Sequence, residues 1–417
     1  MERRKIALLI LNEYESNQTY LNLALKSGLL KLKEGRNFVT ELVYGVVRYR
    51  RFLDEKISQY SSVKLKKLSV SVKNILRIGF YQIYFMDKVP PFAILNESVK
   101  LTEKFSYKSK GFVNAILRKG LEKTEEALPI YIKESVSDEL YELISSQYRE
   151  QTESILRYLN HKIPAMLRYH HIRYPDAKAA AQKLGNAVVL GDALIPRTSG
   201  NLLSLIESGD FSIQSLSSQM AVRVLAPKEG ERILDCCAAP GGKTAYIGEL
   251  MKNRGEIVAC ELHPHRCELI EKNLNRCGIE IASVQKADAR TVTFPEKFDR
   301  ILADVPCSGI GVIGSKPDIK WRDFQFDTLI PIQAEILKNV STYLKKDGIL
   351  VYATCTINQE ENERQIQRFL AENPTFSLEP FSITINDRVY GESGMAQILP
   401  NGITIGFFIA KLRKTKE

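Results

Sequence analysis

Residues 232–244 read RILDCCAAPGGKT, and this stretch decides the fold of the second half of the chain. Ile233 and Leu234 form a short apolar run of the kind that a buried strand carries, and Asp235 follows them. Gly241 and Gly242 allow a tight turn, after which a helical pattern begins. A strand, a glycine turn and a helix in this order predict the first unit of an open α/β sheet.

The same alternation of strand and helix continues from residue 231 towards the C-terminus. Strands are predicted at 232–236, 256–261, 283–286, 300–304, 349–354 and 405–411. Helices fit between them at 243–252, 264–276, 325–344 and 360–372. Because parallel strands are joined by helical crossovers of one hand, this rhythm predicts a doubly wound, largely parallel, Rossmann-like sheet. We place this α/β domain at residues 221–417.

The glycine turn is a candidate ligand loop, because the first turn of a helix offers unpaired N–H groups. It matches neither the G-x-G-x-x-G dinucleotide fingerprint nor the G-x-x-x-x-G-K-[ST] phosphate loop. Glu261 ends the second predicted strand, where an acid can accept hydrogen bonds from ribose hydroxyls. Asp288 follows the third strand and is well placed for an adenine amino group. Together these features predict a nucleoside cofactor without a pyrophosphate.

Two thiols lie at the ends of the next two predicted strands, where ligands bind in open α/β sheets. Cys307 closes the run ADVPC, which begins with Ala303 and Asp304, and Cys355 follows LVYAT. A thiolate that adds to C6 of a pyrimidine pushes electron density onto C5, which can then attack a methyl sulfonium. An acid near N3, a role open to Asp304, favours this addition. The residues alone leave open which thiol attacks and whether each is an inert buried cysteine.

The first 125 residues combine helical periodicity with positive charge, and we predict an all-α bundle. Residues 1–130 hold 24 Lys and Arg against 13 Asp and Glu, so they carry the whole surplus of a chain whose net charge is +10. The basic residues expected on the outside of the bundle are Arg48, Arg50, Arg51, Lys64, Lys66, Lys67, Lys108, Lys110, Arg118 and Lys119. Such a surface favours a polyanion such as RNA, with a merely solvated face or a protein-docking module as alternatives.

Residues 126–220 mix helical pieces with short apolar runs such as 187–190, and they predict a small α+β connector. The chain has no apolar run near the ~20 residues that a membrane-spanning helix needs. Its seven cysteines form no C-x-x-C pair, and its five histidines do not cluster with them. We therefore expect no metal site, no membrane contact and a reduced, cytoplasmic protein. We also expect a monomer.

The motifs CCAAPGGKT, ADVPCSG, KPDIKW and YATCTINQEENE resemble those of RNA 5-methylcytosine methyltransferases that use S-adenosylmethionine. The segments ELVYGVVRYRRFLD, ILRIGFYQIYFMDKVPPFAILNESVKL and GFVNAILRKGL resemble the NusB-like RNA-binding domain of one branch. That branch, the RsmB type or Sun family, methylates cytosine C5 in bacterial 16S ribosomal RNA. The resemblance covers nearly the whole chain and implies 16S rRNA as the partner, with cytosine 967 as the target.

The resemblance also implies a role for each matching residue. It makes Cys355, in the T-C motif, the nucleophile, and it associates Cys307 with release of the methylated base. Asp304 would be the acid near cytosine N3. Cofactor contacts are implied for Cys237, Ala238, Ala239, Pro240, Gly241, Gly242, Lys243, Glu261, Asp288 and Asp304. Glu261 stands where relatives usually have aspartate, which adds a methylene to its reach.

Two other functions stay open at this point. The chain could be an RNA-binding assembly factor with a decayed catalytic domain, although the retained thiols and acids argue against this. It could also be a DNA cytosine methyltransferase, in which the thiol of Cys307 would attack instead. Trp321, the single tryptophan, could stack on an extruded base. We favour packing for it, because large aromatic residues mostly serve cores.

Overall fold

The computed structural model describes residues 2–17, 20–123, 127–197, 202–385 and 388–416. The chain divides into two compact units, a helical unit of residues 1–160 and 316–322 and an α/β unit of residues 161–315 and 323–417. The helices that precede residue 160 in the predicted connector thus belong to the helical unit. The boundary predicted at 125 lies outside the described residues, and the three-domain division stays a prediction.

The helical unit contains ten α-helices among its described residues. They are α1 (Glu2–Asn17), α2 (Leu21–Leu29), α3 (Arg36–Arg48), α4 (Arg50–Tyr60), α5 (Val70–Phe85), α6 (Pro91–Phe105), α7 (Lys110–Gly120), α8 (Ile130–Lys133), α9 (Asp138–Tyr148) and α10 (Thr152–Asn160). The predicted all-α character of this region is confirmed. The proline pair at 90–91 also starts a helix as expected, because the first helical position needs no free N–H.

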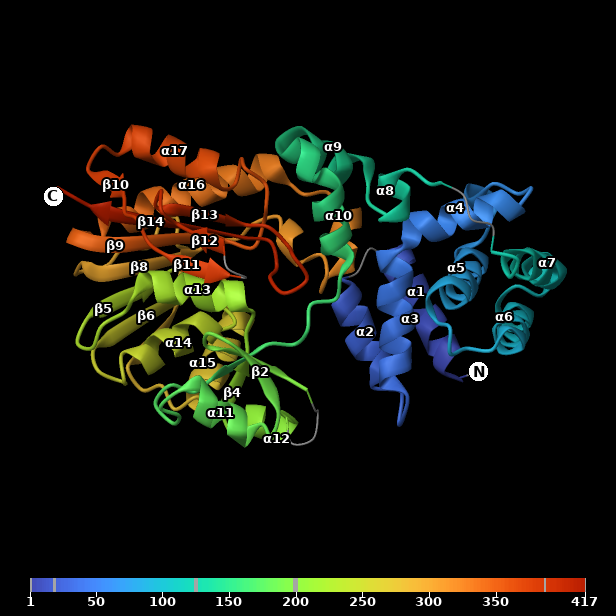
Figure 1. Cartoon of the computed structure of the whole chain (residues 1–417), viewed down its shortest axis with the longest axis horizontal. Helices are drawn as coiled ribbons and strands as arrows, with labels where there is room; N and C mark the ends of the chain where they lie inside the picture. Colours follow the sequence, from blue (N-terminus) through green and yellow to red (C-terminus); the bar gives the residue numbers. More distant parts are fainter. Residues whose placement is uncertain (1, 18–19, 124–126, 198–201, 386–387, 417) are drawn as a thin grey trace. The chain divides into compact units, whose positions relative to one another are not determined.

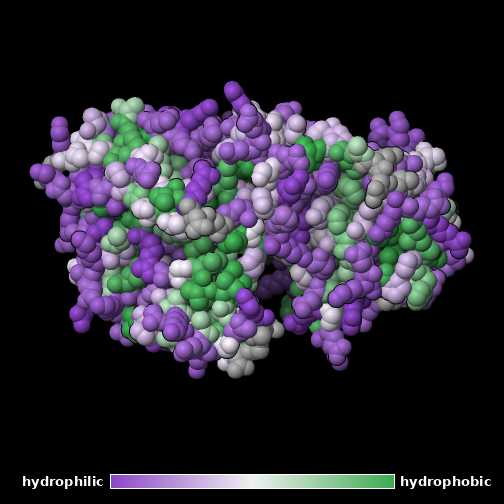
Figure 2. All heavy atoms as spheres, viewed as in Figure 1, coloured by the Kyte–Doolittle hydropathy of each residue, from purple (hydrophilic) through white to green (hydrophobic). Residues whose placement is uncertain are grey.

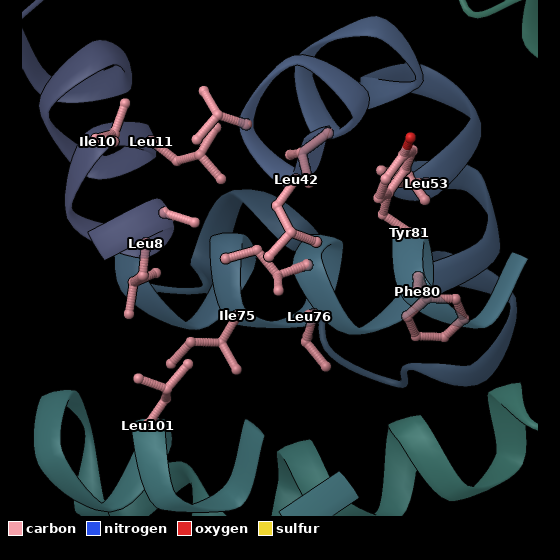
Figure 3. Packing of buried hydrophobic residues seen from close by; sticks show 14 of the residues in the cluster. Leu8, Ile10, Leu11, Leu42, Leu53, Ile75, Leu76, Phe80, Tyr81 and Leu101 are labelled. Atoms are coloured by element: carbon pink, nitrogen blue, oxygen red, sulfur yellow. The ribbon is translucent and has the colours of Figure 1, made fainter. Parts of the chain in front are cut away.

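Helix α5 forms the centre of the helical core. The Ser69 hydroxyl caps it by accepting a hydrogen bond from the Val72 N–H at 3.3 Å. Figure 3 shows Ile75 and Leu76 of α5 among leucines of α1, α3 and α6. Ile75 and Leu76 are fully buried, so α5 is held on several sides by apolar contacts.

Three of the arginines predicted on the basic exterior are engaged within the helical unit. Arg48 is only 4% exposed, so its prediction as a surface residue is wrong. The Arg50 guanidinium lies 4.0 Å from the ring centroid of Trp321. Arg51 donates to the Val136 carbonyl at 2.8 Å and pairs with Asp138 at 2.7 Å. The exposed basic residues of the predicted set are Lys64, Lys66, Lys67, Lys108, Lys110, Arg118 and Lys119.

Within the described residues, the α/β unit is built on an eight-stranded sheet. Its strands are β5 (Arg232–Asp235), β6 (Glu256–Glu261), β7 (Ala282–Lys286), β8 (Phe298–Asp304), β9 (Leu344–Thr354), β10 (Phe376–Leu378), β13 (Met395–Ile398) and β14 (Phe407–Lys414). Their order is β10-β14-β9-β8-β5-β6-β7, with β13 also paired to β14. Strands β5 to β9 pair in parallel, whereas β14 runs antiparallel to β9. The chain order reverses beside β5, which makes the ends of β5 and β8 a topological switch point.

Helices cover both faces of this sheet, as Figure 1 shows. One face packs against α13 (Leu216–Leu225), α14 (Gly242–Leu250) and α15 (Pro264–Arg276). The other packs against α16 (Phe326–Thr342) and α17 (Glu363–Glu372). The predicted doubly wound, largely parallel architecture is therefore confirmed. Burial on both faces explains why the strands read as continuous apolar runs in the sequence.

A separate antiparallel sheet precedes the large one in the chain. It has the order β2-β3-β1-β4 and comprises β1 (Leu167–Tyr169), β2 (Ala187–Leu190), β3 (Ala193–Pro196) and β4 (Phe211–Ile213). Helices α11 (Ala177–Lys183) and α12 (Leu202–Glu207) lie between its strands in sequence, and β11 (Ile383–Ile385) pairs with β12 (Arg388–Tyr390) later in the chain.

Hydrophilic residues occupy much of the face seen in Figure 2. Among the described residues, no helix has the length and apolar character to cross a membrane.

Candidate active site

The glycine loop joins β5 to α14 and carries residues Cys237 to Gly241. Gly241 has a φ of +94°, and a side chain there would bring Cβ within 3.0 Å of the Ile270 Cα, so only glycine fits without strain. Asp235, at the end of β5, is 1% exposed and accepts a hydrogen bond from the Thr244 hydroxyl at 2.7 Å. Burial raises the pKa of Asp235 to about 6. This bond fixes the first turn of α14 against the strand that leads into it.

Two carboxylates follow at the ends of the neighbouring strands. Glu261 ends β6, is 5% exposed and accepts from the His263 N–H at 3.1 Å. Asp288 lies just beyond β7, and the Arg290 guanidinium donates to its oxygens at 2.6 and 3.0 Å. These hydrogen bonds lower the pKa of Asp288. Because β6 and β7 are parallel neighbours, the structure brings both predicted cofactor acids to the same edge of the sheet as the glycine loop.

Lys243 and Asp304 form an ion pair between α14 and β8, with 2.6 Å between the Lys243 Nζ and the Asp304 Oδ2. Burial by itself would lower the pKa of Lys243, but the Asp304 carboxylate raises it above its ordinary value. The Lys243 ammonium therefore stays charged, and its interaction with a thiolate at Cys355 is favourable. The side chain of Asp304 is 25% exposed, so it remains accessible from the strand ends.

The two predicted thiols lie in contact. Cys307 follows β8 and Cys355 follows β9 directly, and their sulfur atoms are 3.4 Å apart. This proximity follows from the parallel pairing of β8 with β9, in which Asp304 lies opposite Ala353. The hydrogen bond with Cys355, burial and the negative charge of Glu361 raise the pKa of the Cys307 thiol well above its ordinary value. Cys307 is therefore a protonated thiol at neutral pH.

The loop that carries Cys307 is fixed to the backbone at Cys355. The Gly311 N–H donates to the Cys355 carbonyl at 3.0 Å, and the Gly406 N–H donates to the Gly311 carbonyl at 3.1 Å. A Cβ at Gly311 would lie 1.9 Å from the Gly406 carbonyl oxygen. Three separate parts of the chain thus meet at this point, and only a residue without a side chain permits it.

Three of the residues that shape this site were not singled out from the sequence. They are Arg290, Gly311 and Glu361, which hold Asp288, the Cys355 backbone and the Cys307 loop respectively. A signal for Glu361 exists in the run NQEENE, which places acids five to eight residues after the thiol of the T-C motif. For Gly311 the sequence shows only a glycine in a predicted loop, which is a weak signal. For Arg290 the only signal is its position two residues after Asp288, a predicted site acid.

Lys320 and Trp321, from the KPDIKW motif, belong to the helical unit. The Trp321 Nε1–H donates to the Val47 carbonyl at 2.7 Å, and Trp321 packs against the helical core. Lys320 is fully buried and donates to the Arg48 carbonyl at 2.6 Å and to the Asn160 Oδ1 at 2.8 Å. In this structure Trp321 packs, which is the interpretation that we favoured over stacking on a base.

The arrangement is suited to covalent chemistry on a ligand bound at one edge of the sheet. It places a pair of thiols beside an ammonium–carboxylate pair, and two further acids beside a glycine loop. These groups lie at or shortly after the ends of β5 to β9, and Lys243 lies in the first turn of α14. Among the described residues, no cluster of His, Cys, Asp and Glu could hold a metal ion.

Comparison with known proteins gives two family matches. Residues 222–413 match the model of the family described as 16S rRNA methyltransferase RsmB/F. Residues 1–122 match the model of the NusB family. The NusB match lies within the helical unit, and the RsmB/F match lies within residues that belong mostly to the α/β unit.

Similar proteins extend over the whole chain. A probable ribosomal RNA small subunit methyltransferase B of Bacillus subtilis is 35% identical over 449 residues, which covers 99% of this chain and 98% of that protein. The ribosomal RNA small subunit methyltransferase B of Vibrio vulnificus is 34% identical and covers 81% of this chain and 83% of its own length. The crystal structure of NSun6 from Pyrococcus horikoshii with SFG has a TM-score of 0.61 at 23% identity, and covers 67% of this chain and 99% of that chain.

Proposed function

The chain belongs to the RsmB/F family of 16S rRNA methyltransferases, and from this membership we propose that it methylates carbon 5 of a cytosine, cytosine 967, in 16S rRNA. The observation that carries the proposal is the contact between the sulfur atoms of Cys307 and Cys355, 3.4 Å apart beside the Lys243–Asp304 pair. C5 methylation of cytosine requires a nucleophile at C6, and two thiols at one strand edge suit attack and release.

The residues of the glycine loop and the strand ends fit S-adenosylmethionine as the cofactor. Glu261 can accept hydrogen bonds from ribose hydroxyls and Asp288 from an adenine amino group, while Gly241 lets the backbone approach a ligand closely. When bound, S-adenosylmethionine supplies the methyl group. SFG, held in the NSun6 crystal structure, is an analogue of S-adenosylmethionine, which supports the same cofactor here.

We assign attack to Cys355. The charge of Lys243 favours the thiolate of Cys355, which adds to C6 of the cytosine. We assign to Asp304, at the end of β8, the role of the acid near N3: its protonated form donates a proton to N3 as the thiolate adds, and it takes that proton back when the ring is restored. The addition makes C5 nucleophilic, so that C5 accepts the methyl group.

Release then restores the aromatic ring. The C5 proton leaves to water, its bonding electrons form the C5–C6 double bond, and the C6–S bond breaks. The electron pair of that bond returns to the sulfur of Cys355. Cys307, protonated and 3.4 Å away, donates a hydrogen bond to the departing sulfur.

The helical unit is the proposed contact for the RNA backbone. Its exposed lysines and arginines, such as Lys66 and Lys108, can neutralise phosphates. RNA binding should therefore weaken steeply with salt. We further propose that the protein is a monomer that acts in the cytoplasm, where it meets its ribosomal substrate.

Bisulfite sequencing of 16S rRNA tests the function. Cells that lack this protein should lose one 5-methylcytosine, at position 967. Complementation with the wild type should restore the mark, and complementation with Cys355→Ala should not. The matched control is Cys277→Ala, because the Cys277 thiol lies beside Ser212 and outside the site. Persistence of the mark in the deletion strain would refute the proposal.

A trapped complex tests the assignment of the two thiols. Cys307→Ala should accumulate a covalent complex with 16S rRNA that survives denaturing electrophoresis, because release is slowed. Cys355→Ala should form no such complex. A complex that forms through Cys307 in the Cys355→Ala variant would reverse the assignment, as expected for the DNA-type chemistry.

A further inference from the structure

Glu361 is a buried acid in the segment that follows Cys355, and it contacts the loop that carries Cys307. It is 0% exposed and lies six residues after Cys355, just before α17. Its carboxylate accepts from the Ser308 N–H at 2.8 Å, the Ser308 hydroxyl at 2.6 Å, the Gln333 side-chain amide at 3.0 Å and the Asn358 side-chain amide at 3.3 Å. Four neutral donors from three parts of the chain thus converge on one charge.

Each donor fixes one element of the site. Ser308 directly follows Cys307, so two hydrogen bonds to Glu361 hold the loop at the position of that thiol. Asn358 belongs to the segment that follows Cys355. Gln333, from α16, donates to the Pro306 carbonyl at 2.9 Å as well as to Glu361, which fixes the other side of Cys307.

The backbone of Glu361 is fixed as firmly as its side chain. Its carbonyl accepts from the Tyr352 hydroxyl at 2.7 Å, and Tyr352 is a fully buried residue of β9. The carboxylate therefore cannot move away from the loops without breaking contacts inside the core. A buried charge with fixed donors imposes its geometry on the groups around it.

We propose that Glu361 is a positioning residue for product release, which holds Cys307 against Cys355 so that the Cys307 S–H meets the departing sulfur. This inference rests on the proposed function, since it concerns the release step of the same reaction. The negative charge of Glu361 also adds, after the hydrogen bond with Cys355 and burial, to the raised pKa of the Cys307 thiol. Glu361 acts through Ser308 and Cys307 and does not itself touch the cytosine.

The experiment compares Glu361→Gln with Glu360→Gln in the purified full-length protein. Glu360 is the adjacent acid of the same segment, but its carboxylate pairs with Arg364 and Arg368 rather than with the loop that carries Cys307. Three quantities are measured with 16S rRNA: the rate of the first methyl transfer, the steady-state turnover, and the fraction of protein in a covalent RNA complex.

Glu361→Gln should keep its first methyl transfer within about threefold of the wild type, lose at least about tenfold in turnover, and accumulate the covalent complex. Adding Cys307→Ala to it should cause no further loss, because the two substitutions remove the same interaction. Glu360→Gln should behave as the wild type. Ser308→Ala removes the hydroxyl donor and keeps the backbone donor, so it should also lower turnover and raise the fraction of covalent complex. This variant replaces Glu361→Gln if Glu361→Gln does not fold.

The outcomes separate this inference from the proposed function. If the wild type neither methylates C5 nor forms a complex with Cys355, the proposed function fails. If the wild type does both, but Glu361→Gln or Ser308→Ala slows the first methyl transfer and turnover by the same factor, Glu361 is only structural and the inference is overturned. Unchanged turnover in both variants would overturn it as well.

Discussion

The sulfur of Cys307 lies 3.4 Å from the sulfur of Cys355, although 48 positions separate the two residues in the sequence. Parallel pairing of β8 with β9 creates this contact, because both strands end at the same edge of the sheet. The distance is too long for a disulfide, whose sulfur atoms are ~2.05 Å apart, yet short enough for one to form after a small movement. We therefore expect the pair, proposed above to act in catalysis, to be sensitive to oxidants as well.

Diamide should join the two thiols and stop methylation. The oxidant takes two electrons and two protons, one from each thiol, and leaves a Cys307–Cys355 disulfide. Mass spectrometry of the digested protein should detect the crosslinked peptide, and dithiothreitol should restore activity. The crosslink should be absent from Cys307→Ala. Recovery of both peptides as free thiols after loss of activity would contradict the prediction.

Gly311→Ala should lower methylation by at least about tenfold, because the new Cβ would lie 1.9 Å from the Gly406 carbonyl oxygen and 2.8 Å from that of Cys355. The loop must move away, and Cys307 moves with it. Gly111→Ala is the control, since a Cβ at that helical position meets nothing within 4 Å. A methylation rate equal to that of the control would show that the loop tolerates the displacement.

The sequence predicted the sheet and most of its ligand edge, because strands buried on both faces are written as apolar runs between glycine turns. The thiols and the proposed cofactor acids could be placed at this edge for the same reason, because each lies at the end of a strand or within three residues of it. The antiparallel direction of β14 could not be read from residues 405–411, since an apolar run carries no information on its partner.

The contacts of Glu361 could not be predicted either. Its donors lie at positions 308, 333 and 358, and only the folded chain brings them together. The predicted exposure of Arg48 was wrong for a related reason. A basic residue on an amphipathic helix is expected in solvent, but tertiary packing buries this one. Charge patterns predict exposure well only where no neighbouring element covers the helix.

Asp235→Asn should make the stability of the protein less sensitive to pH. Burial raises the pKa of Asp235 to about 6, from 3.8 ordinarily, so the folded state binds more protons than the unfolded state between these values. The wild type should thus lose about 2 kcal/mol of unfolding free energy from this group as pH rises from 4 to 7. The asparagine variant should lack that loss in urea unfolding followed by circular dichroism.

Asp299→Asn provides the control, because the pKa of Asp299 is shifted in the opposite direction to that of Asp235. Burial alone would raise the pKa of Asp299, but hydrogen bonds from the Arg232 N–H and from Lys345 lower it. The Asp299 carboxylate therefore stabilises the fold above its unfolded pKa, and this stabilisation disappears as pH falls. Relative to the wild type, Asp299→Asn should become less stable as pH rises through the acidic range from below the folded pKa to just above 3.8, and it should change little between about pH 5 and 7. An identical pH response of the two variants would contradict both assignments.

Lys320→Met should destabilise the helical unit, and the loss should grow with pH. The substitution leaves the Arg48 carbonyl and the Asn160 Oδ1 without the Lys320 donor, at a cost of about 1–3 kcal/mol. Burial and the charge of Arg48 lower the pKa of Lys320 well below its ordinary value, so over the alkaline range the unfolded state binds the extra proton. The wild type gains stability as pH rises through that range, and the methionine variant cannot.

The fluorescence of Trp321 reports unfolding of the helical unit directly, because Trp321 is the single tryptophan and packs against the helical core. Urea unfolding of wild type and Lys320→Met should be compared at pH 7 and pH 9. The exposed Lys316 of the same segment supplies the control, and Lys316→Met should match the wild type at both pH values. If the difference in unfolding free energy between wild type and Lys320→Met does not widen from pH 7 to pH 9, the pKa of Lys320 is not lowered in the folded state and the prediction is wrong.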